Sequence, residues 1–195
     1  MCDTALELGP DAATLCDPWH VKQLISHLVL RERSPRAIGF TVPPFARLAE
    51  GGMAKLEDKD FVELVERFRS PGLVPFGLRG VEPAFNTLEH FVHHEDMRRA
   101  QAEWSPRELP EADENTIWSF VMLLGRVMAR RAHVPVRIES GSRSAALRGG
   151  KPAVVVRGRP SELALLLNGR GRVADVECDG PADLVATFHK ADFSV

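Results

Sequence analysis

The chain has 195 residues, which suffices for two small domains or for one domain with an appendage. Hydrophobic residues make up 44% and charged residues 27%, as in ordinary globular proteins, and 25 basic against 27 acidic residues leave a net charge of −2. That balance argues against nucleic acid as the main partner. No apolar run reaches the roughly 20 residues that cross a bilayer, and the first residues lack signal-peptide features, so we expect no membrane partner.

The three cysteines are odd in number, far apart and without a CxxC spacing. This pattern argues against a disulfide framework and favours a reducing compartment, so we expect a cytoplasmic protein. Cys16, just before a predicted helix, is a candidate reactive thiol, although small buried cysteines with no such role are common.

Up to about residue 132 the apolar spacing is mostly helical. Residues 1–8 are short for a bundle helix. The first long helix is expected to begin at Asp17-Pro18, an N-cap followed by proline, and to end before Pro35. Its apolar stripe consists of Val21, Leu24, Ile25 and Leu28. A short helix is expected between "VPPF" and "EGG", a compact amphipathic one over residues 58–70, and longer ones over about residues 82–102 and about residues 111–131, with a proline- and glycine-rich loop over residues 71–83.

The remaining sequence changes to short β-rich runs between glycine-containing turns. Strands are predicted over residues 134–140, 144–149, 152–158 and 173–180, and helices over residues 159–169 and 181–191. The order βββαβα predicts a small α+β module. The sequence therefore predicts an α+β protein with a helical domain over residues 1–132 and this module over residues 133–195.

Three of the seven histidines lie in one window, "NTLEHFVHHEDMRRA", residues 86–100. At about 100° per residue, Glu89, His93 and Asp96 share one helical stripe. That stripe is bordered by Phe85, Val92 and Ala100. Burying such charges is costly unless a partner compensates them, and a divalent cation is one such partner. His90 and His94 point further toward the polar side, so we expect His94 to be solvated or to support a ligand.

A third ligand has to come from another helix, and His27, at the edge of the Leu24/Leu28 face, is the best candidate. Two histidines and one glutamate leave positions open for water or substrate, which is typical of catalytic sites. Zinc fits this set best, and nickel or iron(II) also accept it. Two alternatives stay open: a Glu–His pair at i, i+4 is often a surface pair, and the cluster can be a polar core network without metal.

Several segments resemble DinB-like proteins, in the branch that contains mycothiol-dependent maleylpyruvate isomerase. "LCDPWHVKQLISHLVLRER", with tryptophan eight positions before His27, resembles the first metal-ligand helix of that branch. The window at residues 86–100 resembles its E-x3-H-x2-D segment. "GRPSELALLLNGR" and "VECDG" resemble its sterol-carrier-like module. The nearest resemblance is to short actinobacterial members described only as metal-binding proteins.

The resemblance implies a DinB-like four-helix bundle over residues 1–132 and a sterol-carrier-like module over residues 133–195. It implies His27, Glu89 and His93 as metal ligands, with Asp96 orienting a ligand or substrate and Arg31 meeting an anionic group. It also implies a metal-dependent thiol S-transferase or isomerase that uses mycothiol and an electrophilic small molecule. A non-catalytic carrier of metal or a small ligand is the alternative, as a monomer or a homodimer.

Overall fold

The computed structural model describes residues 1–40, 42–70 and 82–193, with the backbone alone for residues 82–86. Residues 71–81 of the predicted loop and the side chain of Phe85 lie outside the described residues. Contacts divide the chain into two units. Unit 1 consists of Met1–Glu82 and His93–Trp104, and unit 2 of Pro83–Val92 and Ser105–Val195.

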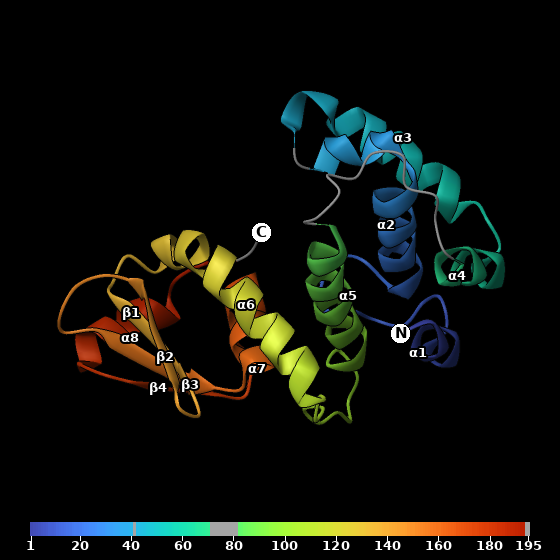
Figure 1. Ribbon diagram of the computed structural model, residues 1–195. Coiled ribbons are helices and arrows are strands. Elements are labelled where there is room, and N and C mark those ends of the chain that lie inside the picture. The colour runs from blue at the N-terminus through green and yellow to red at the C-terminus, as the bar shows by residue number, and fades with distance from the viewer. Residues whose placement is uncertain (41, 71–81, 194–195) are drawn as a thin grey trace. The chain divides into compact units, whose positions relative to one another are not determined.

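Unit 1 is helical (Figure 1). Its helices are α1 (Cys2–Leu8), α2 (Val21–Arg33), α3 (Ala46–Glu57), α4 (Phe61–Arg69) and the second part of α5 (Glu82–Arg98). Two 3-10 turns, η1 (Pro35–Phe40) and η2 (Pro43–Phe45), join α2 to α3. Helix α2 packs against both α3 and α4, and α1 packs against α4. The predicted stripe on α2 is confirmed, since its four residues are fully buried.

The start of α2 differs from the prediction. The helix begins at Val21, not at Asp17-Pro18, and His20 precedes it in an extended conformation. His20 pairs with Ala13 in an isolated β-bridge, and its N–H donates to Gln23 Oε1 at 3.1 Å, as in a capping box. Residues 13–20 thus form a closed turn ahead of the helix. The predicted end before Pro35 is confirmed, because Ser34 is extended.

Helix α3 is longer than the short helix expected between "VPPF" and "EGG". It continues through Gly51 and Gly52 to Glu57. A Cβ on Gly52 would lie 2.6 Å from a terminal methyl group of Leu30 on α2. Glycine therefore serves here to let two helices approach closely and does not end the helix.

Unit 2 contains a four-stranded sheet. Its helices are the first part of α5, α6 (Glu111–Met128), α7 (Pro160–Leu165) and α8 (Ala182–His189), with short helical turns at Ala129–Ala132 and Leu166–Arg170. Its strands are β1 (Val136–Ser140), β2 (Arg143–Arg148), β3 (Val154–Gly158) and β4 (Val176–Asp179). The strand order is β2-β1-β3-β4; β1 and β3 are parallel and the other two pairs antiparallel. The predicted order βββαβα and the α+β class are confirmed.

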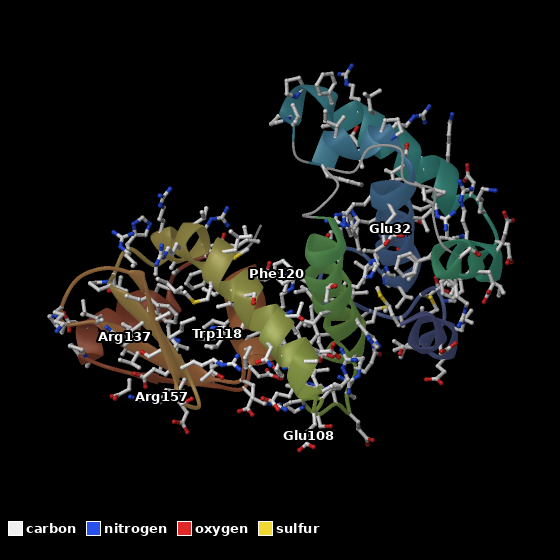
Figure 2. All side chains as sticks on the ribbon, in the orientation of Figure 1. Glu32, Glu108, Trp118, Phe120, Arg137 and Arg157 are labelled. Carbon is white, nitrogen blue, oxygen red and sulfur yellow. The ribbon has the colours of Figure 1, made fainter. Side chains whose placement is uncertain are left out.

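The two faces of the sheet differ in polarity. Val136, Ile138, Val154 and Val156 are buried in one core with residues of α6, α7 and α8. The opposite face carries Arg137 and Arg157, labelled in Figure 2. Arg157 donates to Glu139 on the neighbouring strand at 2.9 Å. This alternation is typical of a sheet with one covered and one solvated face.

The contact units differ from the predicted division at residue 132. Helix α6, expected in the helical domain, packs on α7 and β2, and its buried Ile117, Phe120 and Val121 belong to the core of unit 2. The physical reason is that one apolar face of α6 is buried against the sheet module. The four-helix bundle remains a prediction. Within residues 1–40, 42–70 and 82–193, no helix combines the length and hydrophobicity needed to cross a bilayer.

Candidate metal site

His27 lies on α2 in an aromatic setting. The residue is only 9% exposed to solvent. The ring centroid of Trp19 lies 5.2 Å from that of His27, and the centroid of Phe40 lies 4.5 Å from it. Trp19 comes from the turn before α2 and Phe40 from η1. The turn, the helix and η1 together therefore fix the imidazole in a largely dry position.

The structure brings His27, Glu89 and His93 together. One ligand atom from each lies within 4.8 Å of the other two, and the His27 and His93 ring centroids are 5.4 Å apart. Glu89 precedes His93 by one turn of α5 and is half-buried, while His93 is 9% exposed. Metal bonds of about 2.0–2.2 Å place two ligand atoms at most about 4.4 Å apart, slightly below the 4.8 Å within which these three atoms lie. Two imidazoles and a carboxylate are donors that suit a divalent ion.

Asp96 contacts His93 from the other side of the imidazole. The Asp96 carboxylate is fully buried, and its Oδ2 accepts a hydrogen bond from His93 Nδ1 at 2.8 Å. Because Nδ1 is engaged by Asp96, an ion would bind at Nε2 of the ring. A carboxylate bound to the second nitrogen of a histidine is a common way to orient a metal ligand. Asp96 thus occupies the position that the predicted orienting role requires.

Cys16 joins this network. Its thiol donates to the same Asp96 Oδ2 at 3.0 Å, and its Sγ lies 3.8 Å from His93 Nδ1. The backbone explains the approach, because the N–H of Leu15 donates to the Asp96 carbonyl at 3.1 Å. Cys16, His93 and Asp96 form a second group of ligand atoms within 4.8 Å of one another. Both groups therefore use His93.

The turn that carries Cys16 and Trp19 is held from within. The Thr14 hydroxyl donates to the Trp19 carbonyl at 2.6 Å and accepts from the Cys16 N–H at 3.1 Å. The Trp19 N–H donates to the Cys16 carbonyl at 2.8 Å. Sequence reasoning missed this turn, although a threonine two residues before Cys16 is a signal for such side-chain-to-backbone bonds. The turn presents the thiol and the indole to α5 and α2 respectively.

A buried ion pair one residue from Asp96 was also missed. Glu95 is fully buried, and its Oε2 lies 2.6 Å from Nε of Arg99, which is 3% exposed. Arg98 donates to both Glu95 oxygens at 3.0 Å. The i, i+3 and i, i+4 spacings were the available signal. These bonds are local, and they stabilise the last turn of α5, next to Asp96.

The other predicted residues lie around the site. His94 is half-buried, and its Nε2 lies 2.9 Å from the Thr4 hydroxyl, so it connects α5 to α1. Arg31 is half-buried on α2, one turn after His27, and its role stays a prediction. His90 is half-buried on α5. None of these three belongs to either ligand group found among the described residues.

The resemblance to the DinB-like family is supported by sequence motifs alone. No protein-family model matches the chain, and comparisons with curated proteins and with solved structures found no match either. The resemblance to DinB-like proteins and its chemistry therefore stay predictions.

Proposed function

We propose that this chain binds a divalent ion through His27, Glu89 and His93 and is a metal-dependent enzyme of the thiol S-transferase or isomerase type. The observation that carries the proposal is the convergence of three ligand atoms within 4.8 Å, two of them on nearly buried histidines. Zinc suits these ligands best, and nickel or iron(II) are the other metals we would test.

The number of protein ligands favours catalysis over a structural role. Structural zinc sites usually have four protein ligands, whereas catalytic sites have three and keep an open position. Cys16 approaches His93 at Nδ1, the nitrogen that Asp96 holds, so its thiol lies on the Asp96 side of the ring. Cys16 is therefore not a member of the group formed by His27, Glu89 and His93. When bound, a divalent ion lowers the pKa of a low-molecular-weight thiol such as mycothiol and holds its sulfur.

The surrounding residues would prepare the site for that chemistry. Asp96 holds the proton on His93 Nδ1 and so fixes the ring. Trp19 and Phe40 pack on His27 and exclude water from it. Exclusion of water strengthens the interaction of a histidine nitrogen with a cation. The chain's own residues thus orient two ligands and keep them dry.

The test follows the reaction of mycothiol with monochlorobimane, with and without added Zn²⁺ or Ni²⁺. In this reaction the thiol sulfur displaces chloride from carbon, a C–S bond replaces the C–Cl bond, and the thiol proton passes to solvent. We expect metal-dependent formation of the fluorescent product by the wild type and by His90→Ala, and only the uncatalysed rate with His93→Ala. His90 is a matched control because it lies on the same helix.

The alternative function has its own outcome. A protein that binds metal in a His93-dependent manner yet consumes no thiol with neutral, anionic or cationic electrophiles, such as chlorobimane, a maleyl compound and a quaternary-ammonium bimane, would be a non-catalytic carrier of metal or a small ligand. That result would overturn the enzymatic part of the proposal and leave the metal site in place.

A further inference from the structure

A cavity of about 380 Å³ lies within unit 1. Its wall comes from the turn before α2, from η1 and from α3. The lining residues are Trp19, Gly39, Phe40, Ala46, Ala49, Glu50, Met53 and Glu57. The volume falls within the range of small-molecule sites, and the mixture of aromatic and apolar residues with a few polar groups is also typical of them.

The cavity adjoins His27. Trp19 and Phe40 line it, and the same two rings contact the His27 imidazole. Gly39 lets η1 approach Phe45 and α3 closely, because a Cβ there would lie 2.4 Å from the Phe45 carbonyl oxygen and 2.8 Å from Ala49 Cβ. A molecule in the cavity would therefore lie against the residues that position a candidate metal ligand.

The charges on the cavity wall have one sign. Among its described lining residues the ionisable ones are Glu50 and Glu57, and no lysine or arginine is present. Gln23 donates to Glu57 Oε2 at 3.4 Å while its own Oε1 accepts from the His20 N–H, so Glu57 is tied to the start of α2. Arg31, the cation predicted near the site, is not one of the lining residues.

Two carboxylates beside aromatic rings favour one class of guest. A carboxylate-bearing molecule would be repelled by Glu50 and Glu57. An ammonium group would be attracted by them and by the faces of Trp19 and Phe40, which also attract cations. Because Glu50 is exposed and Glu57 half-buried, solvent screening limits the effect to the scale of surface ion pairs.

We infer that the cavity selects a small organic cation, with its apolar part among Trp19, Phe40 and Met53 and its charge toward Glu50 and Glu57. A second step of the inference rests on the proposed function. If the cavity holds the substrate of that enzyme, the electrophile carries a positive charge and no carboxylate.

The first experiment measures binding without turnover. Ligand-observed NMR titrations compare benzyltrimethylammonium, benzyl alcohol and benzoate, three probes that share a phenyl ring. We expect the cation to bind the wild type at least about fivefold more tightly than benzoate, the difference that one exposed ion pair supplies. The variant Glu50→Gln/Glu57→Gln should bind the three probes alike, whereas Glu7→Gln, which removes an exposed carboxylate of α1, should keep the preference.

Equal or tighter binding of benzoate by the wild type would overturn the inference, as would the absence of binding by all three probes. This comparison needs no variant, so it decides even if the double substitution impairs folding. A preference that persists in the folded double variant would also overturn it.

The second experiment separates this inference from the proposed function. Mycothiol is offered monobromotrimethylammoniobimane, which is cationic, or the neutral monobromobimane, and the uncatalysed rates are subtracted. Catalysis that favours the cationic reagent supports both proposals. Cation-selective binding without catalysis supports the cavity assignment and defeats the proposed function. Catalysis without any charge preference in rate or binding defeats the cavity assignment alone.

Discussion

The buried carboxylate of Asp96 holds Nδ1 of His93 at 2.8 Å. Both residues lie on α5, three positions apart, so the contact depends on the helix itself and little on the rest of the chain. The hydrogen bond fixes the orientation of the imidazole, so that a metal would bind at Nε2. The proposed role of His93 as a metal ligand therefore depends on Asp96.

Asp96→Asn should weaken metal binding without removing it. The amide can still contact His93, but it lacks the charge that makes the imidazole a better ligand, and loss of such a partner typically costs about 10–100-fold in metal affinity. Competition with a chromophoric chelator measures the zinc Kd of each variant. Asp58→Asn, an exposed carboxylate after α3, is the control. An unchanged Kd for Asp96→Asn would show that Asp96 does not support a ligand.

Cys16→Ser distinguishes the two ligand groups. Serine keeps a donor for Asp96, so we expect full metal content if His27, Glu89 and His93 bind the ion. If Cys16, His93 and Asp96 bind it instead, loss of the thiol should abolish zinc binding, since the thiolate would be a ligand. Elemental analysis of the purified variants decides, with Cys2→Ser as the control. Loss of metal from Cys16→Ser alone would contradict the proposed ligand set.

Two adjacent glycines of α3 should respond in opposite ways to alanine. Nothing lies within 4 Å of a Cβ built on Gly51, so Gly51→Ala should stabilise the protein by about 0.5–1 kcal/mol through helix propensity. Gly52→Ala would force a methyl group against the buried side chain of Leu30, and overpacking costs about 1–3 kcal/mol.

Denaturant unfolding of Gly51→Ala, Gly52→Ala and the wild type measures both changes. Each alanine variant serves as the control for the other, because the two share helix, neighbours and substitution. Stabilisation by Gly52→Ala equal to that by Gly51→Ala would mean that α2 and α3 are not in close contact at this position.

Much of the helical part was predictable because its signals are local and periodic. The apolar stripe on α2 and the stop before Pro35 depend only on helix geometry and proline sterics. The errors came where a tertiary contact outweighs a local signal. Asp17-Pro18 belongs to the turn closed by Thr14, and Gly52 lies inside a helix because Leu30 requires the space.

In the candidate site, too, local spacing predicted some residues, and tertiary contacts determine the others. Any helix places Glu89, His93 and Asp96 on one side, so these residues could be selected from spacing alone. The contact of Cys16 with Asp96 could not be predicted from spacing. It depends on the hydrogen bond between the Leu15 N–H and the Asp96 carbonyl, which joins residues far apart in the sequence. The selection of His27 drew on a resemblance as well as on its helix face. The contact of its ring with Phe40 depends on the course of η1, which has no periodic signal.

Metal content per chain is the most direct test of a metal site formed by His27, Glu89 and His93. The wild type, His27→Ala, His93→Ala and His90→Ala are purified identically, incubated with Zn²⁺, desalted and analysed for bound metal. The proposed site predicts one tightly bound ion in the wild type and His90→Ala, and none in His27→Ala or His93→Ala, with all four folded by circular dichroism. Equal metal content in all four folded proteins, or none in the wild type, would contradict it.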